Sequence, residues 1–139
     1  ARDNPILGIG LGNFREVSRQ VYMDKFFRPP HNSFLWALSE GGILVLAAYL
    51  LLFAVMWRDL RRIQQLAPLD ADIAHIATAM RMVFHVLIFF SAFADLWMAP
   101  QIYVIAGLFY SMRRYLEGLA QPERARMPLR QPIPVFAIG

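Results

Sequence analysis

The chain has 139 residues, of which 58% are hydrophobic, and a mean hydropathy of +0.40, whereas a soluble domain contains roughly 45–50% apolar residues. The net charge is +4, but the basic residues flank apolar stretches and do not alternate with aromatic residues on a polar face, which argues against nucleic-acid binding. The chain lacks cysteine, which excludes disulfides, thiolate chemistry and cysteine metal ligands. We therefore expect an all-α polytopic membrane protein that contacts the lipid bilayer and binds no nucleic acid.

Residues 1–32 are expected to form a loop outside the membrane. Three alternating glycines and a Pro29-Pro30 pair occur here, and both features are typical of loops. The chain starts without a signal-peptide pattern, and three spans leave little room to enclose a site. We therefore expect it to be part of a longer protein whose other residues complete any active centre.

The first membrane helix is expected over residues 33–57, because Asn32 and Ser33 are good N-cap residues. About 25 residues at 1.5 Å each extend about 37 Å, more than the ~30 Å of hydrocarbon in a bilayer. The first turns should therefore project from the membrane. Glu40 and the Gly41-Gly42 pair should lie near this boundary, where a carboxylate stays solvated and glycines permit either a bend or close helix packing.

Arginines determine the predicted orientation. Residues 58–72 form a short loop containing three arginines, which the positive-inside rule places in the cytoplasm. A second helix is expected over residues 73–97, followed by an outer turn and a third span over residues 98–115. Residues 116–139 are expected to be a cytoplasmic, disordered tail rich in proline and arginine.

This orientation leaves residues 1–32 on the outer side, although that loop is itself basic. Either the orientation is inverted, or the outer cations have a function. A cluster of external cations would suit an anionic ligand.

One stretch of the chain has the order and spacing of a family motif. A glycine-rich segment, Gly8-Ile9-Gly10-Leu11-Gly12-Asn13-Phe14, is followed by His31-Asn32-Ser33-Phe34-Leu35 and then by Glu40-Gly41-Gly42. This arrangement, over residues 5–57, resembles the O-antigen ligase and polymerase family. The glycines lack the preceding strand that a dinucleotide-binding motif requires, so we assign them to turn formation.

The resemblance implies a multi-pass glycosyltransferase of the bacterial inner membrane, with an active site that faces the periplasm. Such enzymes move a glycan from an undecaprenyl pyrophosphate carrier to an acceptor hydroxyl, without a metal or cofactor. The acceptor is lipid A core, a growing polysaccharide or a protein. The resemblance leaves ligase, polymerase and protein glycosyltransferase open, together with the identity of the sugar.

Six residues are candidates for this site. His31 matches the family histidine, and an imidazole can accept the proton that the acceptor hydroxyl loses. Glu40 is expected to orient this imidazole, bind the acceptor, or remain as a solvated carboxylate. Arg15 and Arg28 are candidates for binding pyrophosphate, because a guanidinium can contact two phosphate oxygens; the alternative is that they are solvated loop charges. Asn32 is expected to be an N-cap, with holding His31 or binding the sugar as the alternatives.

The sixth candidate, Asp95, ends a polar face of the second helix. Arg81, His85 and Asp95 recur at helical spacing, so they should face protein or water rather than lipid. Asp95 is expected either to share an outer cavity with His31 or to be an ordinary helix-end carboxylate. An alternative function uses the same face as the polar path of a non-enzymatic transporter.

Overall fold

The computed structural model describes residues 4–22, 30–67, 71–96 and 98–125, and the side chains of residues 4–20, 30–67, 71–96 and 98–120 among them. Over these ranges the chain is all-α, as predicted, and consists of α1 (Phe14–Tyr22), α2 (Ser33–Leu66), α3 (Ala71–Phe93) and α4 (Pro100–Ala125).

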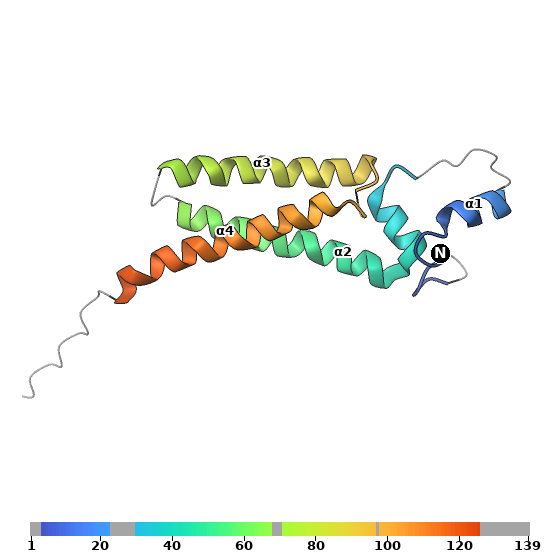
Figure 1. The fold of residues 1–139 in the computed structure, drawn as a ribbon, viewed down its shortest axis with the longest axis horizontal. Coiled ribbons are helices and arrows are strands. Elements are labelled where there is room, and N and C mark those ends of the chain that lie inside the picture. The colour runs from blue at the N-terminus through green and yellow to red at the C-terminus, as the bar shows by residue number, and fades with distance from the viewer. Residues whose placement is uncertain (1–3, 23–29, 68–70, 97, 126–139) are drawn as a thin grey trace, which may run out of the picture.

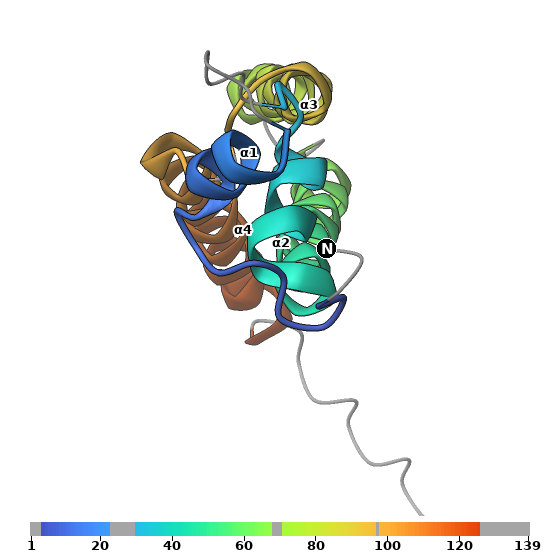
Figure 2. The same ribbon diagram turned by 90° about the vertical axis from the view of Figure 1, so that its right-hand side faces the viewer.

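Helix α2 is the centre of the molecule. Helices α3 and α4 both pack along it, α3 running in the opposite direction and α4 in the same direction (Figure 1). The end-on view in Figure 2 shows α3 and α4 beside α2, with α1 lying across the end that carries the start of α2. The α3–α4 turn therefore lies at the same end of the bundle as the start of α2.

Two apolar clusters hold the three long helices together. The larger cluster includes Phe53 of α2, Phe84 of α3 and Phe109 of α4, whose rings lie 6.2–6.4 Å apart in the Phe53–Phe84 and Phe84–Phe109 pairs. The second cluster lies nearer the far end of α2 and contains Ile63, Ala67, Ala77 and Leu116. Together they keep α2 in contact with both partners along its length.

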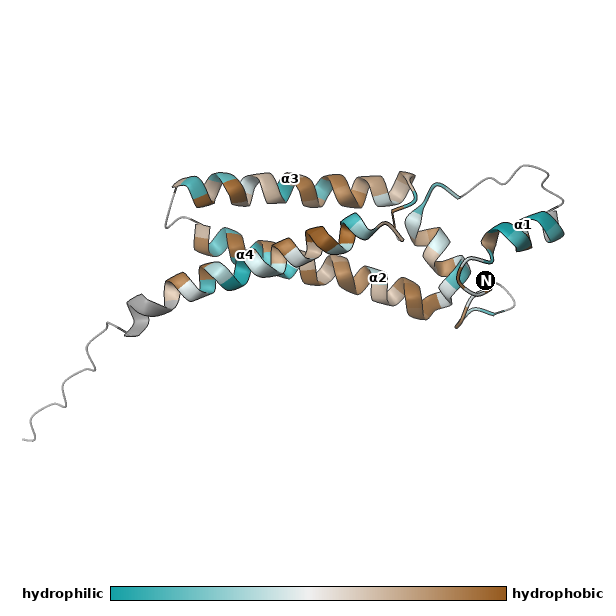
Figure 3. Ribbon diagram, in the orientation of Figure 1, coloured by the Kyte–Doolittle hydropathy of each residue, from teal (hydrophilic) through white to brown (hydrophobic). Residues whose placement is uncertain are grey.

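Figure 3 shows that hydrophobic residues predominate in the middle of α2 and alternate with some hydrophilic ones along α3. Within its most apolar stretch, only 22% of α3 is buried, and side chains such as Met82, Phe89 and Phe93 are exposed. Of the described helices, α2 and α3 are long and apolar enough to cross a membrane. In helix α4 the first charged residue is Arg113, almost four turns after Pro100, so the uncharged part of this helix extends only about 20 Å.

Several predicted boundaries are wrong. Helix α2 continues to Leu66, so the first part of the expected loop 58–72 is helical, and α4 continues to Ala125 through the start of the expected tail. A short helix, α1, lies within the region 1–32 that was expected to be a loop. The expected disorder of the tail beyond residue 125 falls outside the described residues.

Helix α2 is broken at Gly42, as the glycine pair predicted. Gly42 has φ 66° and ψ −162°, a conformation that is essentially restricted to glycine. Figure 1 shows the first turns of α2 at an angle to the rest of the helix. The break frees backbone groups on both sides, which need partners from elsewhere in the chain.

Residues 4–13, which we call the glycine loop, supply these partners. The amides of Ile9 and Gly10 donate to the carbonyls of Ser39 and Glu40 at 3.0 and 2.9 Å, and the amide of Ile43 donates to the carbonyl of Pro5 at 2.9 Å. The glycine loop therefore completes the hydrogen bonds that the broken helix cannot make by itself.

The close approach of the two backbones requires glycine on both sides. A Cβ on Gly42 would overlap the carbonyl of Ile6, and a Cβ on Gly8 would overlap the carbonyl of Glu40. Gly8, Gly10 and Gly12 all have positive φ, which confirms the turn-forming role predicted for them.

Candidate functional site

The start of α2 is fixed by its N-cap. The Asn32 side-chain oxygen accepts a hydrogen bond from the amide of Leu35 at 2.9 Å, which confirms the predicted N-cap. Its amide nitrogen also donates to the carbonyl of Ala92 at 3.0 Å. Asn32 therefore ties the beginning of α2 to the end of α3, and both polar atoms of its side chain are occupied.

Ser33 makes a second connection between these segments. Its buried hydroxyl donates to the carbonyl of Ala94 at 2.6 Å and accepts from the amide of Leu96 at 2.7 Å. From the sequence, Ser33 is expected only to cap α2. A serine next to an N-cap carries no sequence signal that would predict contact with a turn more than sixty residues away.

These contacts bring His31 and Asp95 together. His31 Nδ1 lies 3.7 Å from Asp95 Oδ2, and the imidazole is 71% exposed while the carboxylate is 31% exposed. His31 has φ 43°, an uncommon value for a residue other than glycine. The prediction that Asp95 and His31 face the same outer region is consistent with this pair.

The arrangement suits proton acceptance. A carboxylate on the Nδ1 side favours the tautomer with its proton there, which leaves Nε2 to accept a proton from a hydroxyl. Catalytic hydrogen bonds are often long before substrate binds, so a 3.7 Å separation is compatible with such a role. The exposed ring is accessible to a substrate from outside the bundle.

Glu40 has a different environment from the one predicted. Its side chain is buried, with 1% of its surface exposed, so the expectation of a solvated carboxylate is wrong. One oxygen, Oε1, accepts a hydrogen bond from the amide of Phe14 at 3.1 Å, and Oε2 has no hydrogen-bond partner among the described residues. Glu40 therefore lies at the N-terminus of α1, where the helix dipole favours a negative charge, and not beside His31.

Of the two candidate arginines, Arg15 lies within the described residues and Arg28 does not. Arg15 is exposed in the first turn of α1, which lies across the start of α2 (Figure 2). Arg28 lies outside the described residues. The two proposed pyrophosphate contacts therefore remain predictions.

Arg81 and His85 lie on the exposed surface of α3. His85 Nδ1 lies 2.7 Å from the carbonyl of Arg81, one turn earlier, so this imidazole contacts its own helix. Arg81 lines a hollow of about 300 Å³ with Gln64 and Thr78, at the end of the bundle opposite His31. The part of the predicted polar face that contains Arg81 and His85 is therefore exposed on the surface of α3 and is not enclosed by the other described helices.

No group of three or more His, Asp or Glu side chains in the described ranges could hold a metal ion. No family model, curated protein or solved structure matches this chain.

Proposed function

We propose that this chain is the C-terminal part of a membrane glycosyltransferase. It moves a glycan from an undecaprenyl pyrophosphate carrier to an acceptor hydroxyl on the periplasmic face of the bacterial inner membrane. In this proposal α2 and α3 cross the bilayer, and α4 crosses it with them. The family resemblance supplies the reaction, and ligase and polymerase are two forms of it that differ in the acceptor.

The observation that carries the proposal is the His31–Asp95 pair at one end of the bundle. His31 is the histidine of the family motif, and its imidazole lies 3.7 Å from a carboxylate contributed by another helix end. In the proposed reaction, the oxygen of the acceptor hydroxyl attacks the anomeric carbon of the glycan, and undecaprenyl pyrophosphate leaves. Nε2 of His31 takes up the proton that the hydroxyl loses. Asp95 holds the imidazole in position and stabilises the charge that develops on it.

The apolar exterior supports the membrane location. The exposed side chains of α2 and α3 include Leu50, Leu51, Phe89 and Phe90, and charged residues follow the apolar part of α2 at Arg58. In water this surface would favour aggregation, whereas hydrocarbon solvates it. The positive-inside rule then places the arginines in the cytoplasm and His31 in the periplasm.

The test is transfer activity of the full-length protein with His31→Asn. Asparagine tolerates positive φ but cannot act as a base, so we expect transfer to fall by about 10²–10⁴-fold with unchanged membrane insertion. Asp95→Asn should cause a smaller loss, about tenfold or more, because the imidazole is retained but less well oriented.

The matched control is His75→Ala, which removes an exposed histidine from the first turns of α3 at the opposite end of the bundle. It should leave transfer unchanged. Near-normal transfer by the His31→Asn protein would exclude the proposed base. Solute flux in vesicles that Asp95→Ala abolishes, without any glycan product, would favour the transporter instead.

A further inference from the structure

The end of the bundle opposite His31 has a sharp transition from apolar to charged residues. In α2, Arg58 directly follows Trp57, and in α4, Arg113 and Arg114 directly follow Met112. The ring of Phe84 in α3 lies 5.4 Å from the ring of Trp57 and 6.4 Å from that of Phe109, so the helices are in contact at this level. A bilayer surface that follows the apolar region would therefore meet α2 and α4 at their arginines.

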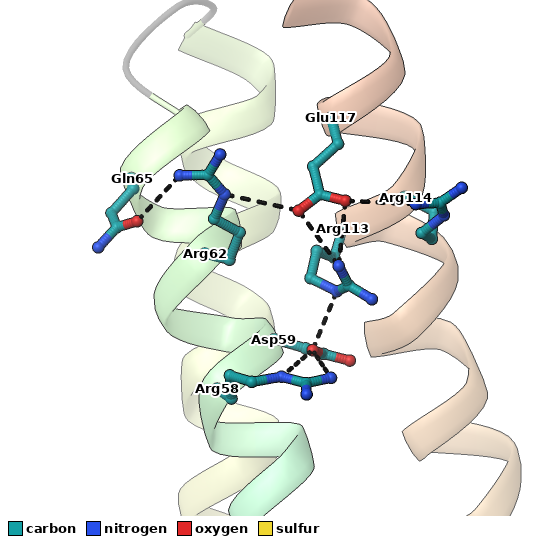
Figure 4. A network of polar contacts seen from close by, with 7 residues as sticks. All are labelled: Arg58, Asp59, Arg62, Gln65, Arg113, Arg114 and Glu117. Carbon is teal, nitrogen blue, oxygen red and sulfur yellow. Dashed lines mark hydrogen bonds and ion pairs between the residues drawn. The ribbon is translucent and has the colours of Figure 1, made fainter.

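Four arginines, Arg58, Arg62, Arg113 and Arg114, gather here around two carboxylates, Asp59 and Glu117. Arg61 lies one turn after Arg58 and contacts Trp57, and we call these five arginines the arginine cluster. Figure 4 shows the contacts of four of the arginines and both carboxylates. Asp59, 1% exposed, has Arg58 Nη2 and Arg113 Nε at 3.0 Å from its Oδ1 atom. The Arg113 guanidinium also donates to both oxygens of Glu117 at 3.0–3.1 Å. Arg113 thus joins α2 to α4.

The cluster has more cationic groups than its own carboxylates can neutralise. Five arginines and two carboxylates leave a net charge of +3. Arg62 and Arg114 reach Glu117 only at 3.5 and 3.7 Å, longer than a hydrogen bond, and their side chains are 44% and 63% exposed. Most of their N–H groups are therefore available to another acceptor.

Aromatic side chains lie beside these arginines. The guanidinium carbon of Arg61 lies 5.0 Å from the centre of the Trp57 ring, and that of Arg113 lies 5.2 Å from the centre of the Tyr110 ring. Tryptophan and tyrosine favour the headgroup region of a bilayer, where one side of the ring meets hydrocarbon and the other meets water. The cluster thus combines surplus guanidinium donors with rings suited to that depth.

We propose that the arginine cluster binds the phosphate groups of anionic phospholipids at the membrane surface. Basic groups between membrane helices recognise such headgroups, and each arginine near the surface contributes attraction to an anionic leaflet. The proposal depends on α2 and α3 lying in a bilayer but not on glycosyl transfer, because the cluster and His31 lie at opposite ends of α2.

The experiment compares the full-length protein with Arg61→Gln/Arg62→Gln/Arg114→Gln. This triple variant retains Arg58 and Arg113, which contact the buried Asp59, so the α2–α4 contact is preserved. The protein is titrated in neutral detergent with phosphatidylglycerol or phosphatidylcholine, and the apparent affinity is taken from the rise in Tm. The Gln variant should bind phosphatidylglycerol about a hundredfold more weakly, and phosphatidylcholine should have a similar effect on both proteins.

A triple variant with lysine at the same three positions is the matched control, because it keeps the charge. It should retain most of the preference for phosphatidylglycerol. Unchanged affinity in the Gln variant would overturn the proposal, as would equal stabilisation by inorganic phosphate, which would assign the cluster to a soluble anion. Loss of transfer in the His31→Asn protein with unchanged lipid affinity would show that the two sites are independent.

Discussion

Replacing Gly42 with alanine should release the glycine loop from the break in α2. Gly42 has φ 66° and ψ −162°, and an added Cβ would overlap the carbonyl of Ile6. The backbone strain costs about 1–3 kcal/mol. Displacing the loop also loses three backbone hydrogen bonds, which contribute about 0.5–1.5 kcal/mol each. We therefore expect the docked loop to lose about 2.5–7.5 kcal/mol of stability.

Hydrogen exchange measured by mass spectrometry tests this directly. The amides of Ile9, Gly10 and Ile43 donate the three bonds, so they should exchange about a hundredfold faster or more in the Gly42→Ala protein, since 1.4 kcal/mol corresponds to tenfold.

Substitutions at two other glycines separate the cost of backbone strain from the cost of displacing the glycine loop. Gly12 has φ 78° but open space around its Cβ position, so Gly12→Ala should show backbone strain alone, about 1–2 kcal/mol. Gly118 is helical with open space, so Gly118→Ala should be neutral or stabilise by up to about 1 kcal/mol. Exchange in Gly42→Ala that matched Gly118→Ala would refute the argument that the two backbones need this glycine.

Two further substitutions test how the long helices are joined. Ser33→Ala should destabilise the full-length protein by about 2 kcal/mol in a denaturant titration, because it leaves a partly buried carbonyl and amide of the α3–α4 turn unpaired. Ser39→Ala, which removes a bond within α2 only, should have little effect. Asp59→Leu should lower the free energy of unfolding by about 3 kcal/mol, because Arg113, 17% exposed, loses a buried partner. Adding Arg113→Leu should recover most of this stability. A double variant no more stable than Asp59→Leu would show that the two residues are not coupled.

The parts of the fold that depend on local chemistry could be predicted from the sequence. The N-cap at Asn32 and the bend at Gly42 follow from residue types whose backbone preferences act within a few positions. The start of α4 at Pro100 agrees with proline's preference for the first helical turn. His31 and Asp95 were both identified as candidates, and the structure adds the contact between them.

The parts that depend on distant partners could not be predicted. The arginines after Trp57 suggested a loop, yet α2 continues because Leu60 and Ile63 face the other helices and are fully buried. Glu40 has the sequence environment of a solvated helix end, and its burial depends on the docking of α1. The pairing of Asp59 with Arg113 crosses two helices, although an acidic residue inside a run of arginines was a signal that could have been used.

The hydrogen bonds between the glycine loop and the break in α2 have a consequence for dividing this chain experimentally. A fragment that begins at the start of α2 would contain every residue of that helix but would leave the carbonyls of Ser39 and Glu40 and the amide of Ile43 without their partners. At the edge of a bilayer such groups find few other hydrogen-bond partners. The shortened helix would therefore be stabilised by straightening at Gly42, because its own backbone groups would then pair, and the end that carries His31 would change direction. The smallest piece that preserves the geometry of the His31 end therefore includes residues 4–13, and activity lost on trimming them would indicate a change of helix direction rather than removal of a reacting group.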